Sequence, residues 1–526
     1  MPANPNLTTL RHVFVDGWRP DYPPSADVQL DQAGGVRVPY MTMAENLLFG
    51  PNGDLQKIPG TGRVNSAALE SGATVTGAFD YWQLGTGGSS TQRRIVNAGT
   101  KIKADAADGT FSDIQTGMVS GAVPTYCPAG DGVIIATDGG DVPQFATGAT
   151  CAALGGTPPT FKWAVKHKNR IFAGGINTAP SDVYYTVFGN HADWAGAGSG
   201  KFTVESSDGD DVIGAASHKG ALIIFKGRQR GSIHVLTGSA PTGDDAFALA
   251  PFQYDVGAVA HNAIFPFGND LGFMSPSGAI HTLSATQAYG SFSLGALTLG
   301  INETLHRRLN FSVIKNASVR NDWIRSRVYA TMAVDGSSTN NLILVLDYRF
   351  SPPRASYITA FTAASLALVK DATDGGRPVV MFGGHDGYLR KFTTTSAIDG
   401  ATAISFRATS PFINYATPHV IKTITGCAVT VQPKNQGSFT FRWQRDNQAQ
   451  QSATLTQGGG VGLDTFVLDT DTLGGSRNSD RFNDGDMLGE YRSIAFDILQ
   501  ETLNQDFAMT GFLTRNEVGG ESYESV

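Results

Sequence analysis

A short hairpin pattern recurs along most of this chain and constrains its fold more than any other feature. Each copy is a β-rich apolar strand, a turn carrying Gly with Asn, Asp or Ser, and an apolar return strand, as in LLFGPNGDLQKI. Gly, Asn and Asp supply the positive φ that tight hairpin turns need. The eight copies begin at Leu47, Ile95, Val133, Ile171, Leu222, Leu271, Val328 and Val379.

The spacing of these copies is typical of one architecture. The intervals between successive starts are 48, 38, 38, 51, 49, 57 and 51 residues, which is the range of β-propeller blades. Radial stacking of small twisted sheets covers both faces of each sheet and leaves only short edges. We therefore predict a β-propeller of six or seven blades, because a four-stranded blade can hold two hairpins. A β-sandwich or an irregular barrel built from the same hairpins is the alternative.

Composition agrees with a mainly β protein of more than one domain. Charged residues make up 16% of the 526 residues, and the chain holds 63 Gly, a mixture that fits short strands and tight turns. Beyond residue 400, segments such as SFTFRWQR alternate like the strands of a sandwich. The predicted domains are an N-terminal arm at 1–40, a β-propeller at 41–400, a β-sandwich-like platform domain at 401–515 and a flexible tail at 516–526.

One segment has a helical pattern. In GINETLHRRLNFSVI, Ile301, Leu305 and Leu309 fall on one helical face, and Asn302 takes the cap position with Glu303 behind it. We expect this segment to be a helical insertion between blades.

Charge and cysteine content exclude several classes. The 39 Lys and Arg against 46 Asp and Glu give a net charge of -7, which argues against sequence-independent gripping of nucleic acid through its phosphates. Cys127, Cys151 and Cys427 lack CxxC spacing, so we expect reduced, mostly buried thiols rather than disulfides or a zinc site. The sequence has neither the apolar core of a signal peptide nor a long apolar span. We therefore expect a protein made in a cytoplasm, without stable membrane insertion.

Catalytic and metal-binding motifs are missing from the sequence. SSDGDD at 206–211 has the residue types of a sialidase Ser-x-Asp-x-Gly box but the wrong spacing, so we interpret it as a polar hairpin end. No HxH, HExxH or Gly-x-Ser-x-Gly pattern is found. Asp480, Asp484 and Asp486 offer oxygen ligands without a calcium loop's closing Glu, and whether they bind a cation stays open. We predict no catalytic residue, no metal and no cofactor.

One basic hairpin tip is the only candidate contact site. Lys226, Arg228 and Arg230 lie in FKGRQRG, where they could contact a phosphate or an acidic partner surface. A solvated turn without a partner is the alternative.

A series of short motifs lies in the middle of the chain. They are NRIFAGG (169–175), PSDVYYT (180–186), GN (189–190), DW (193–194), DVIG (211–214), LIIFK (222–226) and SIHVL (232–236). Nearer the beginning, AENL is followed by GDL and PGT. Over roughly residues 44–240 these motifs resemble those of the tail nozzle, or packaged-DNA stabilisation, β-propeller proteins of short-tailed bacteriophages.

The resemblance implies a structural, non-enzymatic protein of the virion tail that is assembled in the host cytoplasm. It implies a homo-oligomeric ring, expected to be a hexamer, below the portal and the head-to-tail adaptor, with tail fibre or spike proteins as further partners. The ring would retain packaged double-stranded DNA and conduct it without sequence recognition. Because each copy is acidic, we expect a channel wall that repels phosphates.

Two other functions stay open at this stage. A propeller that binds host-surface carbohydrate could stack Tyr184, Tyr185 or Trp194 on sugars, although these rings are better explained by buried packing. A glycan hydrolase would need a pair of placed carboxylates, which the sequence alone does not locate.

Overall fold

The structure is a computed structural model. It describes residues 7–26, 35–84, 90–105, 108–227, 230–284, 296–371, 374–415, 417–431, 437–446, 448–457 and 479–518. The chain divides into two compact units. The propeller unit holds residues 63–344 and 362–391, and the platform unit holds residues 1–62, 345–361 and 392–526.

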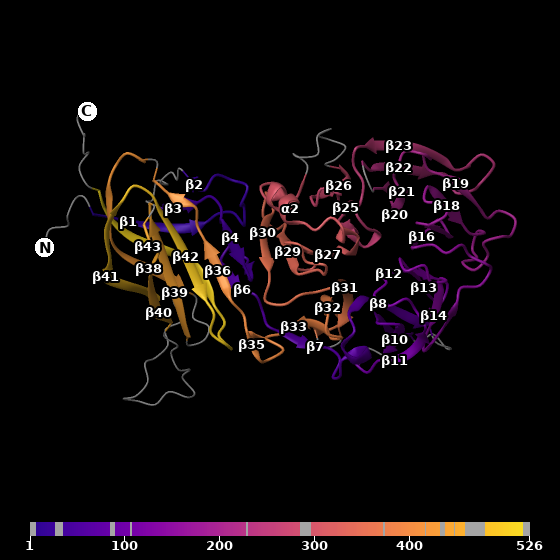
Figure 1. Cartoon of the computed structure of the whole chain (residues 1–526), viewed down its shortest axis with the longest axis horizontal. Helices are drawn as coiled ribbons and strands as arrows, with labels where there is room; N and C mark the ends of the chain where they lie inside the picture. The colour runs from indigo at the N-terminus through magenta and orange to yellow at the C-terminus, as the bar shows by residue number, and fades with distance from the viewer. Residues whose placement is uncertain are drawn as a thin grey trace. The chain divides into compact units, whose positions relative to one another are not determined.

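The propeller unit is built from small antiparallel sheets that follow one another along the chain (Figure 1). The described residues contain seven such groups of strands, of which five are separate sheets and the last two are parts of larger sheets. The predicted β-propeller is therefore confirmed. The first four are β8(Val75–Leu84) to β11(Ser112–Thr116), β12(Pro124–Ala129) to β15(Thr150–Ala153), β16(Trp163–His167) to β19(Gly200–Thr203), and β20(Val212–His218) to β23(Ala248–Tyr254). The other three are β24(Ile264–Phe267) to β26(Ile280–Thr282), β27(Ser318–Asp322) with β28(Arg327–Met332) and the start of β29(Leu342–Asp347), and β31(Ser365–Asp371) to β33(Leu389–Phe392).

The first strand of each sheet lies innermost. Each of these first strands contacts the first strand of the next sheet, in the order β8, β12, β16, β20, β24, β27 and β31. The last of them, β31, contacts β8 again. The sheets therefore close into a ring around an axis, as in a propeller.

The second strand of each sheet explains why the repeat is visible in the sequence. In β17(Arg170–Gly174), Ile171 and Ala173 pack toward the preceding sheet, whereas Phe172 packs toward the following one. In β21(Ala221–Lys226), Leu222 faces one neighbour and Ile223 faces the other. Both faces of these strands are buried, so they are continuous apolar runs. The remaining second strands are β9(Ser90–Ala98), β13(Gly132–Thr137), β25(Asp270–Met274), β28 and β32(Arg377–Gly383).

Seven of the eight predicted repeat starts, from Ile95 to Val379, lie in these second strands. The first start, Leu47, was wrongly included as a blade. It lies in β5(Leu47–Phe49), which pairs with β6(Leu55–Lys57) in the platform unit. A three-residue apolar strand followed by a Gly turn has the same local sequence pattern in a propeller blade and in the platform unit. Only the strand with which it pairs distinguishes the two locations.

The platform unit contains two sheets with a sandwich-like core. One has the order β3(Gly35–Val38), β1(Leu7–Phe14), β43(Ala508–Val518), β38(Lys422–Val431) and β41(Ser479–Tyr491). The other is centred on β42(Ile494–Gln500), which pairs with β36(Phe406–Thr409) and β39(Gly437–Arg445). Phe512 of the first sheet contacts Phe496 of the second, with ring centroids 4.7 Å apart. The predicted sandwich-like second domain is therefore confirmed.

The predicted domain boundaries differ from the observed units. The predicted arm at 1–40 contains β1 and β3, and β1 pairs with β43 from the other end of the chain, Leu7 opposite Glu517. Trp18 is buried as well. Residues 41–62 and 345–361 also belong to the platform unit rather than to the propeller. Of the predicted tail, residues 519–526 lie outside the described residues.

The predicted helical insertion is present as α2(Asn302–Arg308), followed by the 3-10 turn η4(Ile314–Asn316), between β26 and β27. Ile301, Leu305 and Leu309, which the sequence places on one helical face, are all buried. The N-cap is Ile301 rather than Asn302, and the Asn302 side chain instead accepts a 2.5 Å hydrogen bond from the Thr298 hydroxyl. None of the helices in the described ranges is both long enough and apolar enough to cross a bilayer.

Candidate functional site

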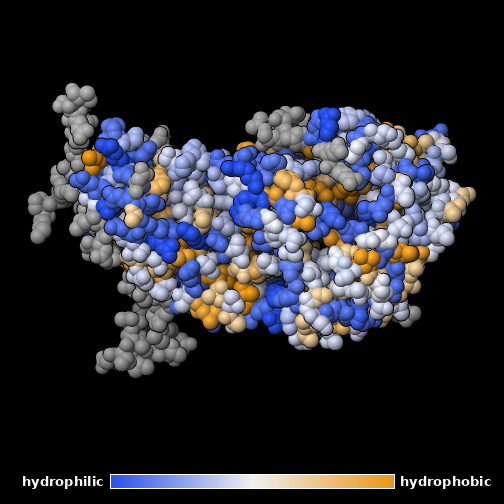
Figure 2. Space-filling view, in the orientation of Figure 1, coloured by the Kyte–Doolittle hydropathy of each residue, from blue (hydrophilic) through white to orange (hydrophobic). Residues whose placement is uncertain are grey.

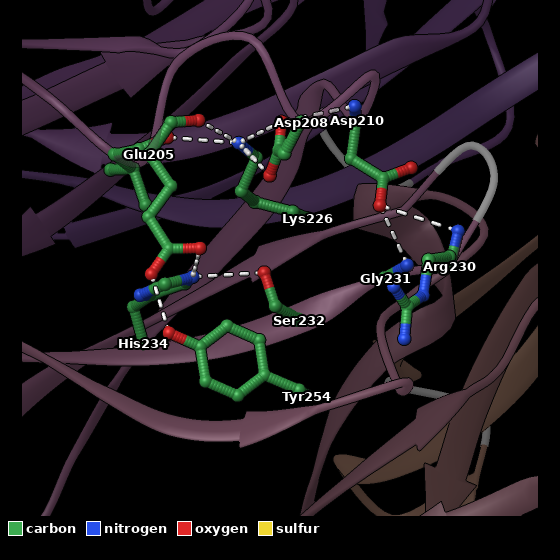
Figure 3. Close-up of polar contacts among 10 residues, drawn as sticks. Glu205, Asp208, Asp210, Lys226, Arg230, Gly231, Ser232, His234 and Tyr254 are labelled. Carbon is green, nitrogen blue, oxygen red and sulfur yellow. Dashed lines mark hydrogen bonds and ion pairs between the residues drawn. The ribbon is translucent and has the colours of Figure 1, made fainter.

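The predicted basic tip lies at the turn between β21 and β22(Ser232–Thr237), and two of its cations, Lys226 and Arg230, have different surroundings (Figure 3). Lys226 is fully buried, so its side chain does not form part of an exposed basic surface. Arg230 is exposed and pairs with Asp255 at 2.5 Å. Arg228 lies outside the described residues.

The Lys226 ammonium is held by the loop that precedes β20. It donates to both carboxylate oxygens of Asp208, at 2.8 and 2.7 Å, and to the carbonyl oxygens of Val204 and Glu205, at 2.9 and 2.5 Å. A buried charge is tolerated when it is paired and hydrogen-bonded in this way. The segment SSDGDD is polar, as predicted, but it is not a hairpin end, because it connects β19 and β20 of two different sheets. It also supplies the counter-ion of Lys226.

Asp210 of the same loop fastens the hairpin turn. Its carboxylate accepts hydrogen bonds from the backbone amides of Gly231, at 2.7 Å, and Arg230, at 3.3 Å. Gly231 has φ +80°, and a Cβ there would lie 2.6 Å from the Gly257 nitrogen, so only glycine fits this turn. The loop before β20 is thus bonded through Asp208 to Lys226, before the hairpin turn, and through Asp210 to Gly231, after it.

A Ser, a His and a Glu lie together beside Lys226, but their geometry is not that of a nucleophilic triad. Ser232 Oγ lies 2.8 Å from His234 Nε2, and Glu205 Oε2 lies 3.9 Å from the same nitrogen. In a triad the carboxylate orients the base through its other ring nitrogen. Burial lowers the pKa of His234, against the opposing effect of Glu205. Glu205 also accepts a 2.6 Å hydrogen bond from Tyr254, and the cluster is best explained as packing of the blade edge.

The central residues that carry the family resemblance lie in the third and fourth sheets of the propeller. Arg170 Nη1 donates to the carbonyl oxygens of Thr186 and Gly198, each at 2.7 Å. Asp182 accepts hydrogen bonds from Lys201 and Thr203, each at 2.6 Å. These contacts join strands and turns of a single blade.

The aromatic residues considered for sugar stacking are engaged in packing. Trp194 is buried against Phe161, with ring centroids 5.3 Å apart. Tyr185 is buried against Phe247, at 5.1 Å. Tyr184 is half-buried, with the Lys201 ammonium 5.5 Å from its ring centre.

The cysteines and the candidate cation ligands complete the predicted sites. Cys127 and Cys427 are buried and Cys151 is half-buried, all three as free thiols, as predicted, and burial raises the pKa of each to about 12. Over the described ranges, no group of three or more His, Cys, Asp or Glu side chains could hold a metal ion. The side chains of Asp480, Asp484 and Asp486 lie outside the described part of the structure.

Comparisons with known proteins give weak likenesses. No protein-family profile and no curated protein matches the sequence. Among solved structures, BamB from Moraxella catarrhalis is 11% identical, with a TM-score of 0.35 over 64% of this chain and 100% of BamB. The extracellular domain of the putative hybrid two-component system BT4673 from B. thetaiotaomicron is 9% identical, with a TM-score of 0.30 over 70% of this chain and 39% of that one. A glycoside hydrolase is 9% identical, with a TM-score of 0.24 over 86% and 99%. At these values the likenesses carry no inference about function.

Proposed function

We propose that this chain is a structural protein of a bacteriophage virion, which forms a ring-shaped tail nozzle below the head-to-tail adaptor. The ring extends the tail channel, retains packaged DNA and conducts it during ejection. The observation that carries the proposal is the role of the residues shared with the nozzle family. Arg170 and Asp182 join the strands and turns of one blade, so the resemblance concerns how the propeller is built.

The charge of the chain supports a conducting role. The net charge of -7 is repeated in every copy of a ring, and an acidic wall would let DNA pass without gripping its phosphates. The predicted basic tip does not oppose this, because Lys226 is neutralised by Asp208 and Arg230 by Asp255. Head-to-tail adaptor, tail fibre or spike proteins would be the neighbours of the ring.

The surface is compatible with contacts to neighbouring subunits. On the face shown in Figure 2, hydrophobic residues gather in small groups among hydrophilic ones. In the propeller unit, Trp323, Phe188 and Trp82 are 60%, 58% and 48% exposed. Aromatic residues are enriched in protein interfaces. Substitution of these three residues can therefore test which surfaces form the contacts between subunits of a ring.

The test is the oligomeric state and shape of the purified protein. We expect mass photometry to show a hexamer and negative-stain images to show six-fold rings. A substitution of one exposed aromatic residue, Trp323→Ala or Phe188→Ala, that blocks ring formation without lowering the melting temperature would locate the interface. A protein that stays monomeric at high concentration and binds host glycans would contradict the proposal and favour a carbohydrate-binding propeller.

A further inference from the structure

The propeller unit has an open pocket of about 570 Å³ at the end of the ring where the innermost strands β12, β16 and β20 begin. Lys162, beside the start of β16, and Asn177, in the turn between β17 and β18(Asp182–Tyr185), line its wall. The inserted segment between β26 and β27 adds Phe311 and Lys315. The volume lies in the range of small-molecule sites.

The charged side chains of this wall cancel. Lys162 and Lys315 are balanced by Asp138 and Asp211, and the Lys315 ammonium lies 2.9 Å from the Asp138 carboxylate. His261 also lines the pocket, and burial lowers its pKa to about 4, so its ring is neutral at pH 7. A cleft lined by one sign of charge concentrates ions of the other sign. This pocket has no such excess, so it suits an uncharged ligand.

Phe311 lies on a turn of the inserted segment. The Val313 amide donates to the carbonyl oxygen of Asn310, at 3.2 Å, and the Asn310 side chain accepts a 3.1 Å hydrogen bond from the Ser312 amide. Asn side chains commonly close turns in this way. The Phe311 ring contacts His306, with ring centroids 5.1 Å apart, and Phe311 is still 45% exposed. The turn therefore holds an accessible apolar ring in the wall of the pocket.

Two polar side chains of the wall are available to a ligand. Among the described residues, neither Lys162 nor Asn177 has a side-chain hydrogen bond or an ion pair. Asn177 is exposed and Lys162 is half-buried. An ammonium offers three donors, and an amide offers two donors and an acceptor. Hydroxyl groups both donate and accept, so they match this pair of side chains.

We propose that this pocket binds an uncharged sugar, a monosaccharide or a disaccharide. A sugar combines the absence of charge with an apolar C–H face, which stacks on Phe311, and with hydroxyl groups, which hydrogen-bond to Lys162 and Asn177. An apolar ligand would leave these polar side chains without partners, and a phosphate would find no excess of positive charge. This inference goes beyond the proposed function and does not depend on ring formation.

The test is binding of glucose, galactose, N-acetylglucosamine and lactose, measured by saturation-transfer NMR and by calorimetry. Glucose 6-phosphate is the charged counterpart of glucose. We expect at least one of the neutral sugars to bind with a millimolar Kd, and glucose 6-phosphate to bind no more tightly than glucose.

Two pairs of variants test the assigned contacts. Phe311→Ala should weaken binding roughly fivefold to tenfold, because the stacking surface is lost. Phe311→Tyr keeps an aromatic ring and should bind like the unchanged protein. Lys162→Met removes a hydrogen-bond donor and should weaken binding by a similar factor. Its matched control is Lys219→Met, at an exposed lysine on the turn between β20 and β21, which should leave binding unchanged.

Three results would overturn the proposal. None of the four neutral sugars binds with a Kd below about 10 mM, or Phe311→Ala binds as tightly as Phe311→Tyr, or glucose 6-phosphate binds more tightly than glucose in a Lys162-dependent manner. Ring assembly is measured on the same samples. Sugar binding by assembled rings supports both proposals, whereas sugar binding by a protein that stays monomeric supports this inference and contradicts the proposed nozzle.

Discussion

The propeller unit and the platform unit are both made of antiparallel strands, but they differ in the distance along the chain over which strands pair. In the propeller unit, β20 to β23 pair with their sequence neighbours. In the platform unit, β1 pairs with β43, close to the other end of the chain. Local pairing leaves a repeated pattern in the sequence, whereas pairing between the termini leaves none.

Removing β1 should have the largest effect, and it tests whether the platform unit depends on pairing between distant parts of the chain. Deleting residues 1–14 takes away the pairing partner of residues 512–517 of β43 and the buried side chains of Leu10, His12 and Phe14. We expect the amides of β43 to lose protection in hydrogen exchange, while those of β21 in the propeller unit keep it. If β43 keeps its protection, β1 does not stabilise the sheet that contains β43.

A single substitution in the platform core should have the next largest effect. Phe512 is fully buried, with ring centroids 4.4 Å from His12 and 4.7 Å from Phe496. Phe512→Ala should lower the free energy of unfolding by about 3–5 kcal/mol, because it leaves a cavity. The control is Leu503→Ala, at a side chain that is 43% exposed, with an expected change within about 0.5 kcal/mol. Equal effects in urea denaturation would contradict the assigned core.

Acid should weaken the propeller unit through its buried histidines. Burial lowers the pKa of His261 and of His281 to about 4, below the ordinary value of about 6.5. The unfolded chain therefore binds more protons than the folded one between these values, and stability is lost as the pH falls from about 6.5 to about 4. The expected loss is about 3 kcal/mol for each group.

The measurement is the free energy of unfolding against pH, followed by hydrogen exchange in β24 and β25. His261→Gln should flatten the curve between about pH 6.5 and 4. The carboxylates of Asp113 and Asp182 have pKa values held below 3.8 by their lysine partners, so their contribution is lost only in stronger acid. An unchanged slope in His261→Gln would show that this ring is not buried as a neutral group.

The smallest expected effect tests the Lys226 cluster. Lys226→Met removes the buried ammonium and keeps most of the side-chain volume, whereas Asp208→Asn leaves the ammonium without its carboxylate. Since Asp208 is partly exposed, we expect a loss of about 1–2 kcal/mol for Asp208→Asn. In the double variant the effect of Asp208→Asn should disappear. Strictly additive losses in denaturant titrations would contradict the pairing.

The sequence predicted the propeller because strands such as β13 and β17 are buried on both faces and therefore form unbroken apolar runs. It also predicted the α2 insertion from the spacing of Ile301, Leu305 and Leu309. It placed Leu47 wrongly, because a short strand's pairing partner is not encoded locally. The sequence did not reveal that Lys226 is buried, because its counter-ion, Asp208, lies eighteen residues away along the chain.

The central claim is that this propeller protein is the nozzle of a phage tail, and imaging the particle tests it most directly. Cryo-electron microscopy of the virion, with the chain carrying a small C-terminal tag, should show a six-fold ring on the tail axis below the adaptor. Its inner wall should be acidic. A particle that lacks the tag at its tail axis, or a ring with a strongly positive lumen, would contradict the account.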